Sequence, residues 1–199
     1  MDTMPSAQSL FFDDPAWDAP LRPCRATRPV APYGVDEARA AWDGWGANCG
    51  PWALAAITGL PLDEVRPLLP AFARRPYTKE TDMRAALTSA GLAWSESLEG
   101  WPAWGLVRVL WRGPWWDDPD PFARLRRSHW VATVDAEDGR WIFDGNAIAA
   151  GGWVRPEAWS RVWAPWIAGS MGEEGTTGAW VAHERFALDV SPAMPSVQV

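Results

Sequence analysis

The fold of this chain is decided by one stretch, Trp45-Gly-Ala-Asn-Cys-Gly-Pro-Trp-Ala-Leu-Ala-Ala-Ile-Thr-Gly59. Its first residues predict a glycine-rich loop, and the small apolar residues that follow predict a helix buried on nearly every side. Pro51 is tolerated in the first turn of such a helix, and Gly59 ends it. We therefore expect Cys49 at the amino end of a buried helix, where free amides and the helix dipole favour a thiolate over a thiol.

A nucleophilic thiol needs a base, and the sequence has only two histidines, His129 and His183. His129 lies in an apolar run over 128–134 that predicts a strand, and a second strand is predicted over 140–146. Asp144 in the second strand is a carboxylate suited to orient an imidazole. We interpret His129 as the general base and Asp144 as the residue that orients it.

The two predicted strands form a hairpin, and its register decides whether Asp144 can reach His129. With a loop of four residues, Asp135 faces Arg140 as an opposite-charge pair at the hairpin end. Because opposite residues share a face and faces alternate along a strand, His129, Asp144 and Asn146 then lie on one face, with Asn146 opposite His129. Asn146 is the fallback orienter, and the alternative for Asp144 is that it only caps the following turn.

Three motifs, in this order, resemble those of the papain-like cysteine peptidase superfamily: Asn48-Cys49-Gly50-Pro51 opening a helix, His129-Trp130-Val131 in a strand, and Phe143-Asp144-Gly145 ending the next strand. The chain is most similar to the branch that includes bacteriocin-leader-processing peptidases, and it resembles uncharacterised bacteriophage proteins of this type. The resemblance spans about residues 42–166. It implies an α+β fold, with N-terminal helices packed on a C-terminal antiparallel sheet and the cysteine at a helix start.

The oxyanion hole is where the chain departs from this superfamily. Papain-like enzymes usually carry a glutamine a few residues before the cysteine, whereas Asp43 stands there in this chain. An ionised carboxylate cannot donate a hydrogen bond to a developing negative charge. The backbone amide of Cys49 remains as one donor, and Asn48, or an indole of Trp42 or Trp45, is expected to supply the second.

A single papain-like domain is expected over 36–190, preceded by a proline-rich arm over 1–35 and followed by a loose tail over 191–199. Cys24 in the arm is expected to be a small apolar filler. His183 falls on the polar side of a late strand, where a solvated residue is expected. The other elements predicted are helices over 36–42, 62–69, 81–91 (capped by Thr81) and 156–163, strands over 106–111 and 179–190, and a loop over 115–121.

The formal charge of −7 argues against nucleic acid or an anionic membrane as a partner. The start of the chain shows no secretory signal, and no apolar run approaches membrane-spanning length. With two cysteines and no disulfide framework, we expect a cytoplasmic protein, in the host cytoplasm if a phage encodes it. No cofactor is expected. Nor is a metal site, because the prolines among Asp117, Asp118 and Asp120 break the spacing of a calcium loop.

These observations predict a thiol-dependent hydrolase of amide or peptide bonds, acting on a peptide, protein or other amide-containing substrate through Cys49, His129 and Asp144. Two alternatives stay open: an acyl transferase of transglutaminase type with the same triad, and a non-catalytic binding module on the same scaffold. Six tryptophans close in sequence either line a groove for a ligand or, as we expect, pack in the core and at its rim: Trp94, Trp101, Trp104, Trp111, Trp115 and Trp116.

Overall fold

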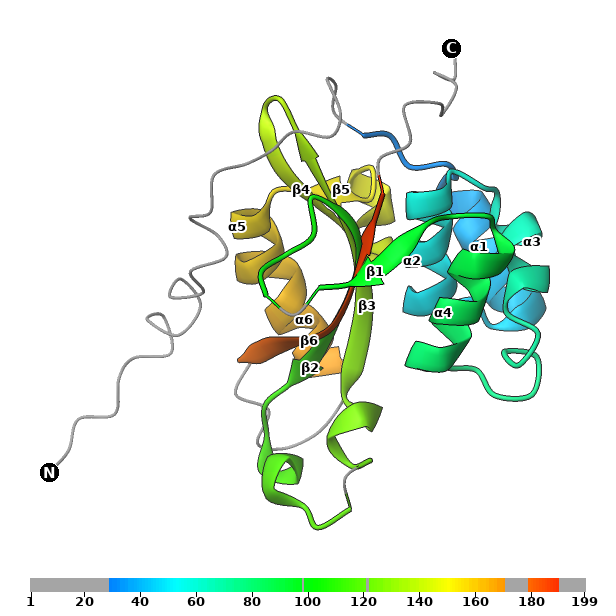
Figure 1. Ribbon diagram of the computed structural model, residues 1–199. Helices are drawn as coiled ribbons and strands as arrows, with labels where there is room; N and C mark the ends of the chain where they lie inside the picture. Colours follow the sequence, from blue (N-terminus) through cyan, green and yellow to red (C-terminus); the bar gives the residue numbers. More distant parts are fainter. Residues whose placement is uncertain (1–28, 98, 121, 171–178, 190–199) are drawn as a thin grey trace, which may run out of the picture.

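The computed structural model describes residues 29–97, 99–120, 122–170 and 179–189 (Figure 1). Four α-helices come first, and a six-stranded sheet follows with the strand order β1-β6-β2-β3-β4-β5. Every neighbouring pair of strands in this sheet is antiparallel. The α+β class, with N-terminal helices and a C-terminal antiparallel sheet, is therefore confirmed.

Glycines set the ends of the first helices. Gly46 and Gly59 adopt left-handed conformations, each with φ of 75°, and their amides bond back to the last turns of the two helices they follow. The helices are α1 (Val35–Trp45), α2 (Cys49–Thr58), α3 (Leu62–Val65), α4 (Glu80–Ser89), α5 (Pro156–Ala158) and α6 (Ala164–Ser170), with a π-helical turn η5 (Trp159–Trp163) and 3₁₀ turns η1 (Arg66–Leu68), η2 (Pro114–Asp117), η3 (Arg124–Arg126) and η4 (Gly145–Ala150).

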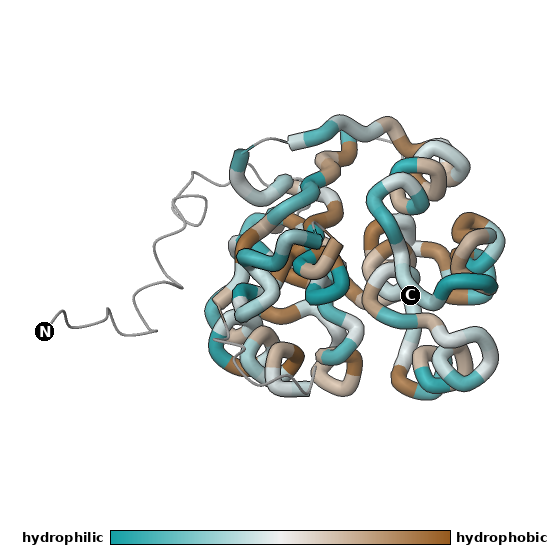
Figure 2. Tube along the Cα trace, turned by 90° about the horizontal axis from the view of Figure 1, so that it is seen from below, coloured by the Kyte–Doolittle hydropathy of each residue, from teal (hydrophilic) through white to brown (hydrophobic). Residues whose placement is uncertain are grey.

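The central strands are buried on both faces, which explains why they lack a polar side in the sequence. Helices α1–α4 cover one face, and α5, η5 and α6 cover the other (Figure 1). Seen from below, the group of α1–α4 and the sheet with its other helices lie side by side (Figure 2). The strands are β1 (Trp94–Glu96), β2 (Trp104–Trp111), β3 (Ser128–Ala136), β4 (Gly139–Phe143), β5 (Trp153–Val154) and β6 (Trp180–Leu188).

The hairpin of β3 and β4 has the register that the sequence predicts. Asp135 pairs with Arg140, and two hydrogen bonds of 2.6 and 2.9 Å join the Arg140 guanidinium to the Asp135 carboxylate. The turn is tighter than expected, since Ala136 also pairs with Gly139 and only two residues remain between them. The register is unchanged by this extra pair, so the faces assigned to the two strands hold.

Strand β6 departs from the simple alternation that the sequence suggests. In a regular strand Trp180 and Phe186, six residues apart, would lie on the same face, but Trp180 packs in the core under α5–α6 and Phe186 in the core under α1–α4. The reason is a β-bulge: Val107 of β2 pairs with Arg185, whereas Val109 pairs with Ala182. One extra residue in β6 reverses the faces beyond that point.

Other element boundaries differ by a few residues. Helix α4 starts at Glu80 and not at Thr81, and Asp82 accepts a hydrogen bond of 2.9 Å from the Lys79 amide at its start. The helix expected over 156–163 continues through η5 and α6 to Ser170. Strands β1 and β5, of three and two residues, were not predicted because they are too short to show a period.

Four of the six clustered tryptophans are buried, which confirms the core interpretation for Trp101, Trp104, Trp111 and Trp115. Within the described part of the chain, no helix is long and apolar enough to cross a membrane. The expected arm up to residue 28, with Cys24, and the expected tail after residue 190 lie outside the described residues.

Candidate active site

Cys49 is the first residue of α2, as the sequence predicts, and Asn48 before it is extended with φ of −132° and ψ of −156°. The first amides of a helix have no acceptor within it, so the N–H groups of Cys49 and Gly50 have no intrahelical partner. Gly50 cannot carry a side chain here, since a Cβ would collide with Oγ1 of Thr78 and lie 2.6 Å from its Cβ. The glycine therefore lets the loop before α4 pack directly against the start of α2.

Gly50→Ala is expected to destabilise the folded protein by about 1–3 kcal/mol, because the added methyl group forces Thr78 or α2 to move. Urea unfolding measures this change. Gly44→Ala in α1 is the matched control, since a Cβ there meets nothing within 4 Å, and it should be neutral or stabilising. Equal unfolding midpoints for the two variants would contradict the close packing at Gly50.

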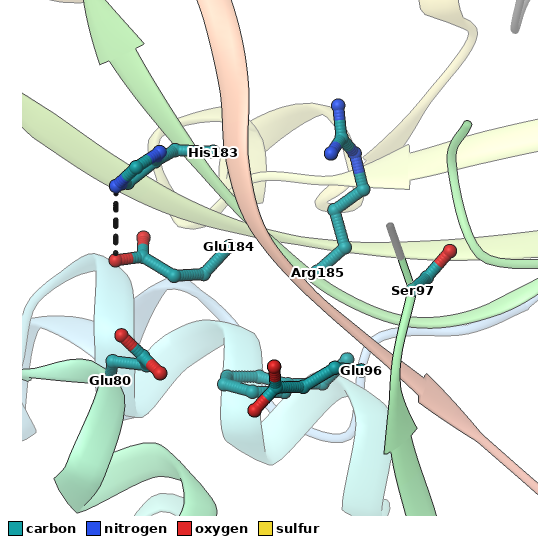
Figure 3. Close-up of a pocket in the computed structure, with 7 residues that line it drawn as sticks. Glu80, Glu96, Ser97, His183, Glu184 and Arg185 are labelled. Carbon is teal, nitrogen blue, oxygen red and sulfur yellow. Dashed lines mark ion pairs between the residues drawn. The ribbon is translucent and has the colours of Figure 1, made fainter. Parts of the chain in front are cut away.

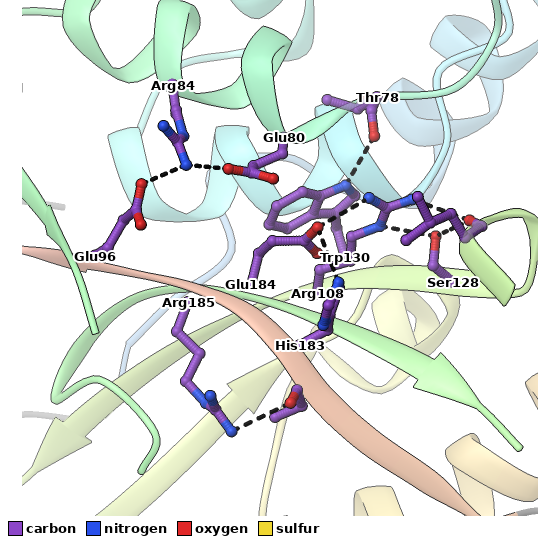
Figure 4. A network of polar contacts seen from close by, with 12 residues as sticks. Thr78, Glu80, Arg84, Glu96, Arg108, Ser128, Trp130, His183, Glu184 and Arg185 are labelled. Atoms are coloured by element: carbon purple, nitrogen blue, oxygen red, sulfur yellow. Dashed lines mark hydrogen bonds and ion pairs between the residues drawn. The ribbon is translucent and has the colours of Figure 1, made fainter. Parts of the chain in front are cut away.

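His129 lies in β3, is 5% exposed and pairs with Val109 of β2. Both of its chain neighbours are held by side-chain hydrogen bonds (Figure 4). Ser128 Oγ accepts from Arg108 Nε at 2.9 Å, and Trp130 Nε1 donates to the Thr78 carbonyl at 3.1 Å. The backbone that carries the imidazole is therefore fixed on one side to β2 and on the other to the loop that contacts Gly50.

Asp144 is fully buried and directly contacts the imidazole, with 3.0 Å between His129 Nε2 and Asp144 Oδ2. The same oxygen accepts a hydrogen bond of 2.8 Å from Trp159 Nε1. The other oxygen accepts from the backbone amide and the side-chain amide of Asn146, at 2.9 and 3.0 Å. A buried carboxylate needs such donors to remain ionised, and this one has four.

The predicted geometry of Asp144 is thus present, but Asn146 does not lie opposite His129. The chain leaves β4 after Phe143, and Asp144 becomes the N-cap of η4, in which Asn146 lies. Gly145 makes this turn possible, because a Cβ there would collide with the indole of Trp52 on α2. Asp144 therefore both caps the turn and contacts His129, and Asn146 supports the carboxylate instead of replacing it.

The charges of Cys49, His129 and Asp144 shift one another's pKa values in the direction opposite to the effect of burial. Burial alone would raise the pKa of Cys49, but the charge of His129, hydrogen bonding to it and the Trp130 backbone lower it. Burial would lower the pKa of His129, but Asp144 and Cys49 raise it to about 10. Burial likewise opposes ionisation of Asp144, yet His129, Trp159 and the Asn146 amide hold its pKa below the ordinary value. All three shifts favour the same charged arrangement, with Cys49 as a thiolate, His129 as an imidazolium and Asp144 as a carboxylate.

These shifts predict an unusual pH dependence of stability. Near neutral pH, Cys49 and His129 together hold one proton in the folded protein, on His129. In the unfolded chain they also hold one proton, on the Cys49 thiol. Because the two states bind the same number of protons, the free energy of unfolding should not change between about pH 6.5 and 8.5. Below pH 6.5 the unfolded histidine takes up a second proton and stability falls. Above pH 8.5 the unfolded thiol loses its proton, and stability falls again until the folded His129 titrates.

Cys49→Ser removes the compensating thiolate and so changes this profile. The folded variant keeps the His129 proton beside Asp144, while its unfolded state loses that proton above about pH 6.5. The difference in unfolding free energy between wild type and variant should therefore grow with pH, by up to about 1.4 kcal/mol per unit between pH 6.5 and 8.5. Parallel profiles over this range in urea unfolding would contradict the charged pair.

The side chains expected to supply the second oxyanion donor, those of Asn48, Trp42 and Trp45, lie in different surroundings. Asn48 Nδ2 donates to the Pro76 carbonyl at 2.8 Å, and Asn48 Oδ1 lies 4.0 Å from Cys49 Sγ. This geometry gives Asn48 a supporting role that ties the cysteine loop to the segment before α4. Asp43 and Trp42 are exposed on α1, and Trp45 packs edge-on against Phe72 with its ring centroid 5.6 Å away.

His183 lies apart from this site, at the bulge of β6. It borders a cavity of about 270 Å³ between the start of α4 and the β1–β6 pair, together with the carboxylates of Glu80, Glu96 and Glu184 (Figure 3). His183 Nε2 is 3.5 Å from Glu184 Oε1, and its side chain is 44% exposed, as expected for a solvated residue. Burial, with Glu80 nearby, raises the pKa of Glu184 although Arg108 and His183 lower it.

No cluster of three or more potential metal-ligating side chains occurs among the residues that the structure describes. Asp118 and Asp120 instead accept hydrogen bonds from backbone amides of their own loop, at 2.7 and 2.9 Å. Comparison with protein-family models, with curated proteins and with solved structures found no match to this chain.

Two residues at the site were missed from the sequence. Trp159 donates to Asp144 from a helix that follows β5, and nothing in its local sequence distinguishes it from the other tryptophans. Thr78 contacts Gly50 and Trp130 from a loop between helices. The sequence contains only an indirect indication of Thr78. Gly50, just after the candidate nucleophile, indicates that another segment packs closely against the start of the helix.

Proposed function

We propose that this protein is a thiol-dependent hydrolase of amide or peptide bonds, with Cys49 as nucleophile, His129 as general acid and base, and Asp144 as the residue that orients the imidazole. The proposal includes a papain-like arrangement, in which a cysteine at a helix start faces a histidine on a sheet. It also places the enzyme in a reducing cytoplasm, where the thiol stays free. The substrate is a peptide, a protein or another molecule with an amide bond.

One observation carries the proposal: the buried contact of 3.0 Å between His129 and Asp144, in a site where His129 also lowers the pKa of Cys49. A histidine filling space in a core does not need a buried carboxylate with three further donors from Trp159 and Asn146. Perturbed nucleophile, base and orienter in one cluster are typical of catalytic sites.

The first half of the reaction forms a thioester. The Cys49 thiolate attacks the carbonyl carbon, a C–S bond forms, and the carbonyl π electrons move onto the oxygen. Because Nε2 of His129 is engaged with Asp144, Nδ1 is the nitrogen that donates its proton to the leaving amine as the C–N bond breaks. The N–H of Cys49 has no acceptor within α2, so it is free of the helix ladder and can donate to the oxyanion.

The second half releases the acid. Neutral His129 takes a proton from water at Nδ1, the hydroxide formed attacks the thioester carbon, and the C–S bond breaks to return the thiolate. Asp144 keeps the imidazole in one tautomer and stabilises its positive charge in both halves. An acyl transferase would follow the same steps with an amine in place of water.

A generic acyl donor tests this proposal without knowledge of the natural substrate. With p-nitrophenyl acetate, we expect a burst of p-nitrophenolate and an acetyl group on Cys49 by mass spectrometry, and neither in Cys49→Ala. Cys24→Ser is the matched control and should retain the burst. A folded wild-type protein that gives no adduct at Cys49 would contradict the enzyme and favour the binding module.

The same adduct separates hydrolysis from acyl transfer. Glycinamide is added in increasing concentration, and acetate and N-acetylglycinamide are quantified. A hydrolase should release mainly acetate at millimolar amine, whereas preferential formation of the amide would assign the protein to the acyl transferases.

A further inference from the structure

Trp159 is the centre of a cluster of indoles on the face of the sheet opposite α1–α4. It is fully buried at the start of the π-helical turn η5, and its ring contacts three others. The ring centroids lie 5.2 Å from Trp180, 6.4 Å from Trp101 and 6.2 Å from Trp111, the last in a stacked arrangement with an interplanar angle of 21°. Contacts on this scale fix the plane of the Trp159 ring.

The one polar group of this fixed ring donates to the carboxylate of the candidate triad. Trp159 Nε1 lies 2.8 Å from Asp144 Oδ2, the same oxygen that contacts His129 Nε2. Asn146 supplies two donors to Oδ1. Each carboxylate oxygen thus has two donors, so the group can neither rotate away from His129 nor take up a proton without losing a hydrogen bond.

The position of Trp159 in a π-helical turn adds to this argument. Such turns insert one residue into a helix, cost stability and occur frequently at functional sites. Here the π-helical turn begins at Trp159, the residue whose indole N–H donates to Asp144. The two residues are fifteen positions apart in the chain, so the contact depends on how this helix packs on the sheet.

We propose that Trp159 is a positioning residue of the active site, which acts through Asp144 by holding the carboxylate ionised and directed at His129. This inference rests on the proposed function for its catalytic meaning. The indole has no contact with substrate in this role. The hydrogen bond from Trp159 keeps the Asp144 carboxylate negatively charged. That negative charge keeps the proton on His129, and the imidazolium in turn keeps Cys49 as a thiolate.

Trp159→Phe removes the donor and keeps most of the ring, and Trp111→Phe is its matched control. Trp111 is equally buried, stacks on Trp159, and its Nε1 has no partner among the described residues. Both variants lose similar packing, but only the first leaves Asp144 with one donor fewer. The pKa of Asp144 then rises, and protonation of Asp144 moves the imidazole proton back to the thiolate.

The readout is the pH profile of Cys49 alkylation by iodoacetamide, followed by mass spectrometry between pH 3 and 8. At low pH the alkylation rate falls as the thiolate is protonated. In Trp159→Phe this acid limb of the profile should move to higher pH by about one unit, as expected for loss of a hydrogen bond to a charged group. In Trp111→Phe it should stay at the wild-type position. The same profile in both variants would overturn the role of Trp159.

A measurement on the wild-type protein covers the case in which Trp159→Phe does not fold. The indole ¹H–¹⁵N resonance of Trp159 should titrate across the acid limb of Cys49 alkylation, whereas that of Trp111 should not. An indole resonance of Trp159 that is constant over this range would overturn the proposal. Neither measurement needs turnover, so failure of the hydrolase assignment would appear in the acyl-trapping experiment and not here.

Discussion

His129→Ala slows the alkylation of Cys49 at pH 6.5 by about 10²-fold or more, although the thiol itself is intact. The imidazolium and its hydrogen bonding lower the pKa of Cys49, and burial opposes them. Without His129 the pKa returns to about 8.5 or above, so at most about 1% of the thiol is ionised at pH 6.5. The rate is measured with iodoacetamide in the Cys24→Ser background.

His183→Ala is the control for this prediction, since His183 is half exposed and pairs with Glu184 at the β6 bulge. It should leave the alkylation rate unchanged. Added imidazole should partly restore the rate in His129→Ala by acting as a base, and it should not change the rate in His183→Ala. Equal rates for the two alanine variants would show that His129 does not activate Cys49.

Asp144→Ala is expected to lower both the reactivity of the site and the stability of the fold. The acyl burst should fall by about 10²–10⁴-fold, because the imidazole loses the group that fixes its tautomer. The free energy of unfolding should fall by about 3–5 kcal/mol, because His129, Trp159 and Asn146 each lose a buried acceptor. Urea unfolding at pH 7 and burst kinetics measure the two losses.

Two variants separate charge from packing in this prediction. Asp144→Asn keeps an acceptor oxygen and the shape of the side chain, so it should recover part of the stability but little of the burst. Asp43→Ala removes an exposed carboxylate and should change neither. An undiminished burst in Asp144→Ala would remove Asp144 from the site.

The sequence predicted the parts of the site that depend on local patterns. A glycine-flanked cysteine before small apolar residues has few interpretations other than a buried helix start, and α2 begins at Cys49. The opposite charges of Asp135 and Arg140 marked the hairpin register, because a slip by one residue separates them. From that register alone, Asp144 and His129 were expected on one face.

The parts that were missed depend on contacts between distant segments. The role of Asn146 depends on the chain leaving β4 at Asp144, which follows from the packing of Trp52 on Gly145. The bulge in β6 depends on its pairing with β2, a strand some 75 residues earlier, and produces no local pattern of its own. Trp159 is brought to Asp144 by the packing of its helix on the sheet. Periodicity carries no information about such contacts.

The proposed function requires Cys49 to be a thiolate at neutral pH, stabilised by His129. Its most direct test is the rate of iodoacetamide alkylation of Cys49 and Cys24 in the same folded wild-type protein from pH 4 to 9. If His129 stabilises the thiolate, Cys49 reacts at a nearly constant rate down to a pH well below 8.5, and faster than Cys24 at pH 6–7. A rate for Cys49 that rises tenfold per pH unit up to about 8.5, with no advantage over Cys24, would contradict it.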